Sequence, residues 1–385
     1  MKNFTYHNPT RILFGKGRIA DLDDHVPDNA RVLILYGGGS AERTGVLDQV
    51  RTALGERTIT EFGGIEPNPR YATAMKAVDT ARQNDVDFLL AVGGGSVIDA
   101  TKFIAAAMYH DGDAWEILTS HGSVVGKAAP FGTVLTIPAT GSEMNPGSVI
   151  THEEKGAKLA FMSAHCYPQF SVLDPEVTFT LPERQIANGV ADAFVHIIEQ
   201  YLTYPVDARV QDGFAETLLR TLIDLGPRAL RDPKNYEVRA NLMWTATLAL
   251  NGLIGAGVPQ DWSSHMIGHE ITALNDTDHA RTLAVVLPAL MDDQRDRKKG
   301  KLLQYAANVW NINEGEDATR IDAAIAATRD FFETMGIETR LADYGVGEAG
   351  IDHIVSALKD HGMTEMGEHS AITPEDARRI LNAAA

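Results

Sequence analysis

Three short apolar runs in the first half of the chain each end in a loop of glycine and other small residues. They are RVLILY (residues 31–36), DFLLAV (87–92) and GTVLTIP (132–138), followed by GGGS, GGGS and ATGSE. Between the first two lies RYATAMKAVDTARQND (70–85), whose apolar residues recur at the spacing of an amphipathic helix. Strand, helix and strand in this order predict a mostly parallel sheet with helices on both faces.

The pattern changes near Leu181, after which long amphipathic stretches follow one another almost to the end of the chain. The segment Thr180–Glu183 predicts a capping box at the first of these helices, and Thr373–Glu375 predicts the start of the last one. We therefore expect a Rossmann-like α/β domain over residues 1–180 and an all-helical domain over residues 181–385.

The composition excludes several classes of protein. Apolar residues make up 44% and charged residues 22% of the 385 residues, which is usual for a globular protein with a large core. The net charge of −18 argues against binding to nucleic acid or an anionic membrane, so an anionic ligand has to be held by backbone N–H groups or a few placed cations. Cys166 is the single cysteine, and no apolar stretch fits a signal peptide or a membrane span. We expect a cytoplasmic protein.

The three small-residue loops are candidate phosphate-binding loops. In a parallel sheet they lie at the carboxyl ends of the strands, where ligands usually bind. Glycine lets the backbone come close to a phosphate, and the start of the following helix supplies N–H donors. The loop at Gly93–Ser96 fits best, with Asp99 and Lys102 on the helix that follows. One GGGS alone is equally well explained as a turn, but three such loops in one domain favour a nucleotide or phosphate site.

The fingerprint of the usual Rossmann dinucleotide site is absent, because its third glycine position holds Ile98 in one loop and Glu42 in the other. The first loop also lacks the carboxylate that binds the ribose 2′-hydroxyl of NAD and repels a 2′-phosphate. This loop consists of Gly37, Gly38, Gly39 and Ser40. It leaves space and donors for that phosphate, which favours NADP, while NAD stays possible.

Aspartate and histidine recur at helical spacing in the second half. Asp192 and His196 share one helix face, as do His265 and His269 on a later helix, and His279 follows beyond a turn. Without a metal, the first pair is explained as a solvent-exposed polar stripe, and the three histidines as a polar face or as core residues with satisfied hydrogen bonds. Together these residues supply one carboxylate and several imidazoles, a set that suits Zn²⁺ or Fe²⁺ rather than Ca²⁺ or Mg²⁺.

These residues and their surroundings resemble the iron-containing (group III) alcohol dehydrogenases, which have a dehydroquinate-synthase-like fold. The similarity covers nearly the whole chain and includes, in order, PTRILFGKG, GGIEPNP, AVGGGSVIDATKFIA, TIPATGSE, VLDPEVTFTLPERQIANGVADAFVHIIEQY, NGLIGAGVPQDWSSHMIGHEITA and DHARTLAVVLPA. Such a series is far more specific than any one loop. Within the family, the chain is most similar to the NADP-dependent aldehyde reductases often called butanol dehydrogenases, whose first glycine loop likewise replaces an acidic residue.

The resemblance implies a role for each candidate residue. One divalent metal, Fe²⁺ or Zn²⁺, is expected on Asp192, His196, His265 and His279, and His269 is expected beside it as a histidine that is not a ligand. As a hypothesis of our own, His269 relays a proton between the alkoxide and water. The dinucleotide contacts implied by the family are Gly94, Gly95, Ser96, Asp99, Thr136, Thr140 and Ser142, with Lys158 as a cofactor-side lysine. The family also implies a homodimer.

We therefore expect an oxidoreductase that transfers a hydride reversibly between NADP(H) and a simple aldehyde or primary alcohol, with the metal polarising the carbonyl oxygen. A polyol dehydrogenase of the same family differs only in substrate and stays open. A cyclising lyase of the same fold, which binds NAD, a metal and a sugar phosphate, fits less well, because the segments 189–200 and 260–270 contain no lysine or arginine. A non-catalytic nucleotide- or metal-binding module is a further alternative. The sequence leaves open iron against zinc, the chain length of the aldehyde and the direction of the reaction.

Overall fold

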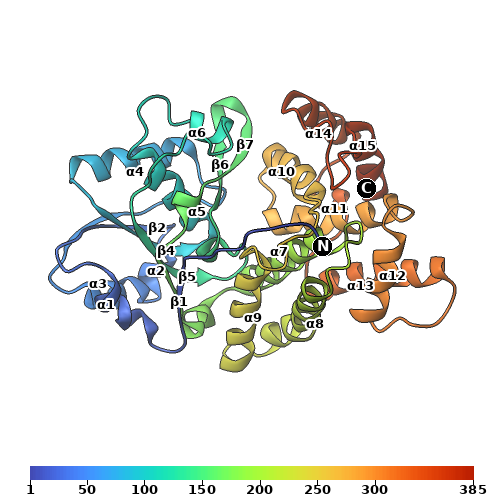
Figure 1. The fold of residues 1–385 in the computed structure, drawn as a ribbon, viewed down its shortest axis with the longest axis horizontal. Coiled ribbons are helices and arrows are strands. Elements are labelled where there is room, and N and C mark those ends of the chain that lie inside the picture. The colour runs from blue at the N-terminus through green and yellow to red at the C-terminus, as the bar shows by residue number, and fades with distance from the viewer. The chain divides into compact units, whose positions relative to one another are not determined.

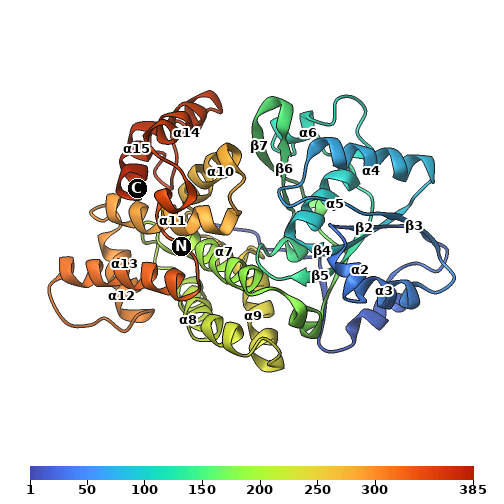
Figure 2. The same ribbon diagram turned by 180° about the vertical axis from the view of Figure 1, so that it is seen from behind.

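The computed structural model describes all residues from Met1 to Ala385 and divides into two compact units. The α/β unit consists of His7–Leu181 and Pro233–Thr247, and the helical unit consists of Met1–Tyr6, Pro182–Asp232 and Leu248–Ala385. Figures 1 and 2 show the sheet of the α/β unit in blue to green and the later helices of the helical unit in yellow to red. The ranges 1–180 and 181–385 remain predictions of the domain boundaries. The two compact units differ from these ranges in two segments, which are described below.

The α/β unit is built on a six-stranded sheet with the strand order β1-β8-β5-β4-β2-β3, in which every pair is parallel. The strands are β1 (Arg11–Phe14), β2 (Arg31–Tyr36), β3 (Thr58–Phe62), β4 (Phe88–Gly94), β5 (Phe131–Ile137) and β8 (Phe170–Leu173). A separate antiparallel hairpin is formed by β6 (Gly147–His152) and β7 (Ala157–Met162). The three predicted strands are β2, β4 and β5, and they are neighbours, so the loops that follow them lie at one edge of the sheet.

Both faces of the sheet are buried, because successive residues of a strand point to opposite sides. In β2, Val32 and Ile34 are buried on one face and Leu33 and Leu35 on the other. The second face is covered by α4 (Tyr71–Gln83) and α5 (Gly95–Ala107), and the first by η1 (Arg18–Asp21), α1 (Leu22–His25), α2 (Ser40–Arg43) and α3 (Val46–Leu54) (Figure 1). The predicted sheet with both faces covered is confirmed. Full burial of each such side chain contributes roughly 1.5–3 kcal/mol.

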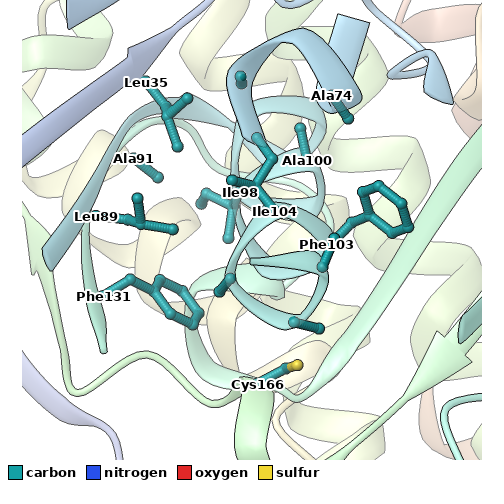
Figure 3. Close-up of a cluster of buried hydrophobic side chains, with 14 of the residues drawn as sticks. Leu35, Ala74, Leu89, Ala91, Ile98, Ala100, Phe103, Ile104, Phe131 and Cys166 are labelled. Atoms are coloured by element: carbon teal, nitrogen blue, oxygen red, sulfur yellow. The ribbon is translucent and has the colours of Figure 1, made fainter. Parts of the chain in front are cut away.

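Figure 3 shows the core between α5 and the sheet. Ile98 and Ile104 of α5 lie toward Leu89 and Ala91 of β4, and all four are fully buried. Helix α5 begins at Gly95, directly after the last residue of β4. This packing therefore fixes the position of the glycine loop. The remaining short elements of the unit are α6 (Glu116–Thr119), η2 (Ser142–Met144), η3 (Glu153–Lys155), η4 (Ala164–Cys166) and η5 (Pro175–Thr180).

From Glu183 onward every regular element is a helix, and the only other pairing is an isolated bridge between Met366 and Ile372. The helices are α7 (Glu183–Tyr201), α8 (Arg209–Arg231), α9 (Tyr236–Ala249), α10 (Ser263–Asn275), α11 (His279–Asp293), α12 (Lys299–Asn308), α13 (Asp317–Thr334), η6 (Leu341–Tyr344), α14 (Glu348–Asp360) and α15 (Pro374–Ala383). The predicted fold class is confirmed. None of these helices combines the length and apolarity that crossing a membrane requires.

Two segments belong to a different unit from their neighbours in sequence. Most of α9 lies in the α/β unit, where Met243 is part of the core and Thr247 donates a hydrogen bond of 2.5 Å to the buried carboxyl of Glu143. The first six residues lie in the helical unit, where the backbone N–H of Lys2 donates to the carbonyl of Gly257 at 2.9 Å. Both chain ends are therefore in the helical unit (Figure 1).

The two predicted helix starts have different outcomes. At α7 the predicted capping box is wrong: Thr180 ends the 3₁₀ helix η5, Pro182 precedes the first residue of α7, and no side chain caps the helix. At α15 the predicted start is confirmed. Thr373 caps the helix and forms a capping box with Asp376, whose carboxylate accepts the backbone N–H of Thr373 at 2.8 Å.

Candidate metal centre and glycine loops

Helix α7 is buried from Ile186 to Tyr201. Asp192 is 3% exposed and His196 is 4% exposed, so the explanation of this pair as a solvent-exposed stripe is wrong. A buried carboxylate is costly unless other groups compensate it. Oδ1 of Asp192 is buried and has no hydrogen-bond partner. A cation beside this oxygen would offset its loss of hydration.

Asp192, His265 and His279 meet at one point in the helical unit. They come from α7, α10 and α11, and each offers a ligand atom within 4.8 Å of the other two. Oδ1 of Asp192 lies 3.7 Å from Nε2 of His279. One carboxylate oxygen and two imidazole nitrogens at this spacing fit a divalent ion such as Fe²⁺ or Zn²⁺.

His196 and His269 lie beside this group. The ring of His196 stacks on that of His265, with centroids 4.7 Å apart, and its Nδ1 lies 3.8 Å from Oδ2 of Asp192. The ring centroid of His269 lies 5.0 Å from that of His279. The structure thus gathers all five predicted side chains. Three of them have the mutual spacing of metal ligands, and the roles of His196 as a fourth ligand and His269 as a proton relay stay predictions.

A glycine allows the two histidine-bearing helices to pack closely. A Cβ atom on Gly268 of α10 would lie 2.9 Å from the hydroxyl of Thr282 and 3.1 Å from the side chain of Leu283, both on α11. A larger residue would therefore displace these side chains of α11 or the helix itself. The glycine between His265 and His269 is explained by this contact.

The start of α11, and with it His279, is held by Asp278. Its Oδ2 accepts hydrogen bonds of 2.7 Å from both Arg184 and Asn188 of α7. Burial alone would raise the pKa of Asp278, but these hydrogen bonds and the charge of Arg184 outweigh it and hold the pKa below its usual value. An ionised Asp278 therefore ties His279 to the helix that carries Asp192. No sequence pattern assigned a role to Asp278, Arg184 or Asn188.

The start of α10 is held by two buried carboxylates. Asp261 accepts the backbone N–H of Ser263 at 2.8 Å, and Glu199 of α7 accepts that of Ser264 at 2.6 Å. The other oxygen of Glu199 bonds to Nδ1 of His265. No sequence pattern assigned a role to Glu199. Its position three residues after His196 was the available signal.

The groups around Glu199 change the pKa of its carboxyl group. Burial and the nearby carboxylate of Asp261 raise the pKa of Glu199 to about 8, whereas the hydrogen bond from Ser264 acts in the opposite direction. A cation close to His265 also favours the ionised form.

A buried ion cluster supports Asp261. The ammonium group of Lys298 lies 2.6 Å from Asp261 and 2.7 Å from Glu368, and all three side chains are almost completely buried. Two carboxylates thus share one ammonium group. Burial and Asp261 raise the pKa of Glu368 to about 7, so this carboxyl keeps its proton more readily than an exposed one.

In the α/β unit, the second glycine loop is required by packing within the protein. A Cβ atom on Gly93 would lie 2.5 Å from the side chain of Val97. On Gly94 it would lie 2.9 Å from the side chain of Ile137, and on Gly95 it would lie 2.5 Å from that of Thr140. No separate turn exists here, because β4 ends at Gly94 and α5 begins at Gly95. Ser96 therefore lies in the first turn of α5, where backbone N–H groups lack helical acceptors.

The first glycine loop is different. A Cβ atom on Gly38 would have no neighbour within 4 Å. Gly39 has a backbone φ of +91°, which residues other than glycine rarely adopt. Ser40 begins α2. The open space at Gly38 agrees with the predicted room for a phosphate.

The predicted contacts Asp99 and Ser142 are joined in a network within the α/β unit. The hydroxyl of Ser142 donates to Asp99 at 2.6 Å and accepts from the buried ammonium group of Lys102 at 2.7 Å. The second oxygen of Asp99 accepts the N–H of Val149 at 3.0 Å. Burial lowers the pKa of Lys102 to about 8 and raises that of Asp99. These residues therefore connect α5 to η2 and β6, whatever else they bind.

The other predicted contacts lie on neighbouring elements. Thr136 is in β5, and the hydroxyl of Thr140 accepts the backbone N–H of Ser142 at 3.2 Å. Lys158 of β7 donates to Asn68 at 2.9 Å. Their roles in cofactor binding stay predictions.

Comparison with known proteins gives the family. Residues 9–175 match the family described as iron-containing alcohol dehydrogenase, and residues 186–385 match the C-terminal part of the Fe-containing alcohol dehydrogenase family. The chain is 60% identical over 386 residues to the NADPH-dependent aldehyde reductase YqhD of Escherichia coli (strain K12), with both chains covered completely. It is 40% identical over 387 residues to the NADH-dependent butanol dehydrogenase A of Clostridium acetobutylicum, with 99% of each chain covered.

Two solved structures agree with this family match. The substrate- and cofactor-free form of the aldehyde reductase YqhD from E. coli has a TM-score of 0.94 at 58% identity, with both chains covered completely. The butanol dehydrogenase A from Thermotoga maritima has a TM-score of 0.95 at 37% identity, covering 100% of this chain and 99% of the other. The chain belongs to the iron-containing alcohol dehydrogenase family.

Proposed function

We propose that the protein is a metal-dependent oxidoreductase that transfers a hydride reversibly between NADP(H) and simple aldehydes or primary alcohols. The observation that carries the proposal is the meeting of Asp192, His265 and His279 in the helical unit. The E. coli relative, named as an NADPH-dependent aldehyde reductase and 60% identical to this chain, supports this choice of reaction.

Asp192, His265 and His279, with His196 beside them, would hold the metal ion. Bound there, a divalent ion supplies Lewis acidity, which polarises a carbonyl oxygen and stabilises negative charge on it by several kcal/mol. The chain holds these ligands in place through Glu199 at His265 and through Asp278 at the start of α11. We assign to His269 the transfer of a proton between the alkoxide oxygen and water, because its ring lies next to that of His279.

The glycine loops would bind the dinucleotide. The backbone N–H groups at the start of α5 suit a diphosphate, because they lack helical acceptors and lie at the positive end of the helix dipole. We propose NADPH as the preferred cofactor because the loop from Gly37 to Ser40 has no carboxylate and has open space at Gly38. Relatives named as NADH-dependent at about 40% identity keep NADH possible.

We further propose a homodimer in the cytoplasm. In the helical unit, the exposed apolar side chains include Met1, Phe4, Val210 and Phe214. The first of these residues bonds through its amino group to the carbonyl of Val206, so the two chain segments lie together. We infer that these side chains belong to the surface that a second copy covers, because such surfaces expose apolar residues. Sedimentation equilibrium tests the oligomeric state.

The test of the reaction is the consumption of NADPH by the purified, metal-loaded protein with butanal. We expect NADPH oxidation with one alcohol formed per NADPH consumed, and loss of the reaction after chelation of the metal. Oxidation of glycerol or another polyol far faster than of butanol would favour a polyol dehydrogenase. No turnover of any aldehyde or alcohol, together with release of phosphate from a sugar phosphate, would contradict the proposal and favour a cyclising lyase.

A further inference from the structure

Glu199 is a buried carboxylate that bonds to two groups at the start of α10. The residue is 3% exposed and lies on α7, three residues after His196. One of its oxygens accepts the backbone N–H of Ser264 at 2.6 Å, and the other bonds to Nδ1 of His265. Its own carbonyl accepts the N–H of Asp261 at 2.9 Å. One residue of α7 thus bonds to the chain just before α10, at Asp261, and within the first turn of α10, at Ser264 and His265.

We propose that Glu199 is a positioning residue that keeps the imidazole of His265 in the tautomer with its proton on Nδ1. The ligand atom that His265 contributes is then Nε2, whose lone pair is directed away from Glu199. A histidine ligand usually has its second nitrogen held in this way, because the hydrogen bond fixes both the tautomer and the plane of the ring. The inference rests on the proposed function in that it assumes a metal ion at Asp192, His265 and His279.

The tautomer of His265 follows from the groups that donate hydrogen bonds to the two carboxylate oxygens of Glu199. The backbone N–H of Ser264 is always a donor, so the oxygen facing it has to accept. When the carboxyl is ionised, which is the form that a cation close to His265 favours, its second oxygen can only accept, so the proton of His265 lies on Nδ1.

The variant Glu199→Gln separates this role from simple packing. An amide has one accepting oxygen and one donating NH₂ group of nearly the same shape. If its oxygen accepts from Ser264, its NH₂ group faces Nδ1 of His265 and moves the ring proton to Nε2, where it blocks the metal ligand. If the amide is turned round, its NH₂ group faces the N–H of Ser264, and the start of α10 loses an acceptor.

Glu270→Gln is a matched control on α10, the helix that carries His265. Glu270 is also buried, and its Oε1 lies 2.8 Å from Nδ1 of His361. The control therefore removes the same charge from another carboxylate–imidazole pair, but His361 is not among the grouped ligand residues.

The measurement is the Kd for Zn²⁺, obtained by competition with a coloured chelator, together with circular dichroism of each variant. We expect Glu199→Gln to weaken Zn²⁺ binding by about 10–100-fold with its helix content unchanged, and Glu270→Gln to bind Zn²⁺ like the wild type. Equal Kd values for Glu199→Gln and the wild type would overturn the inference. Absence of Zn²⁺ binding in the wild type would instead overturn the proposed function.

A second measurement needs no folded variant of Glu199. Nitrogen NMR of the zinc-loaded wild type, labelled at its histidines, reports which ring nitrogen carries a proton, and the signal is assigned by its loss in His265→Asn. We expect a proton on Nδ1 of His265 in a strong hydrogen bond. A proton on Nε2, or no proton on Nδ1, would overturn the inference even if Glu199→Gln fails to fold.

Discussion

Asp192 shows what a sequence pattern can and cannot predict about a single residue. The spacing of Asp192 and His196 correctly places both on one face of a helix, and the family resemblance adds the partners His265 and His279. The same spacing also fits an exposed polar stripe, because it does not reveal what covers that face. Burial to 3% exposure decides the question, and burial depends on residues far away in sequence.

The roles of Glu199 and Asp278 could not be predicted from the sequence, for a related reason. Each lies close in sequence to an expected ligand, but its partner is on another helix. Carboxylates are common on helices, so proximity alone does not assign a role. The hydrogen bond to the neighbouring helix does.

At Gly38 a single substitution tests the choice of cofactor. A side chain fits there, because a Cβ atom would have no neighbour within 4 Å and φ is not positive. We expect Gly38→Asp to lower kcat/KM for NADPH about tenfold or more relative to NADH, because the carboxylate repels a 2′-phosphate and can bind a ribose hydroxyl.

The control is Gly38→Asn, which has the same size but no charge. Comparison of kcat/KM for both cofactors in the three proteins separates charge from bulk. An unchanged NADPH to NADH ratio in Gly38→Asp would show that this loop does not face the 2′-phosphate.

Among the elements, the strands were predicted better than the helix starts. The bounds of β2 agree with the sequence analysis, whereas β4 runs two residues further and includes Gly93 and Gly94. Gly94 pairs with Ile137 of β5, so the neighbouring strand extends β4 into the glycines. The capping box at Thr180 failed because that residue belongs to η5 instead. Local patterns predict an element, but its ends depend on neighbours.

The contact between α10 and α11 gives a prediction for Gly268→Ala. The added Cβ would lie 2.9 Å from the hydroxyl of Thr282, so this side chain, which bonds to the carbonyl of His279, or α11 itself has to shift. We expect the free energy of unfolding to fall by about 1–3 kcal/mol and Zn²⁺ binding to weaken, because His279 moves with α11. Chemical denaturation and the zinc competition assay measure the two effects.

Gly213→Ala is the matched control, because Gly213 lies inside α8 with open space around its Cβ position. Alanine favours the helix there and should add about 0.5–1 kcal/mol of stability. The packing argument fails if both substitutions stabilise the protein.

The cluster of Lys298, Asp261 and Glu368 gives a dependence of stability on pH. The pKa of Glu368 is raised to about 7, above the value of about 4.3 for an exposed glutamate. The folded chain therefore keeps a proton that the unfolded chain releases, and this contribution to stability is lost as the pH rises through about 7. We expect the Tm of the wild type relative to Glu368→Gln to decrease between about pH 5 and about pH 8.

Thermal unfolding of both proteins across this range measures the difference. Glu365→Gln serves as the control, because Glu365 is an exposed residue of the same segment. Parallel Tm curves for the wild type and Glu368→Gln would contradict the assignment of the retained proton to Glu368.

For the whole molecule, sequence patterns predict an α/β part and a helical part, but they do not predict which segments of the chain belong to each unit. Most of α9 packs into the α/β unit through Met243, and the first six residues join the helical unit through Lys2. Both placements depend on partners distant in sequence. A change of pattern near Leu181 marks where the helical segments begin, but it does not show that a later helix returns to the sheet.

The central claim is that one divalent ion binds at Asp192, His265 and His279 and is needed for reduction of an aldehyde by NADPH. Its most direct test is elemental analysis of the wild type and Asp192→Asn, with NADPH oxidation by butanal measured on the same samples. We predict one iron or zinc per wild-type chain, none in Asp192→Asn, and a loss of kcat of about 100-fold or more in the variant. Full activity in a metal-free wild type, or metal and activity both retained by Asp192→Asn, would contradict the account.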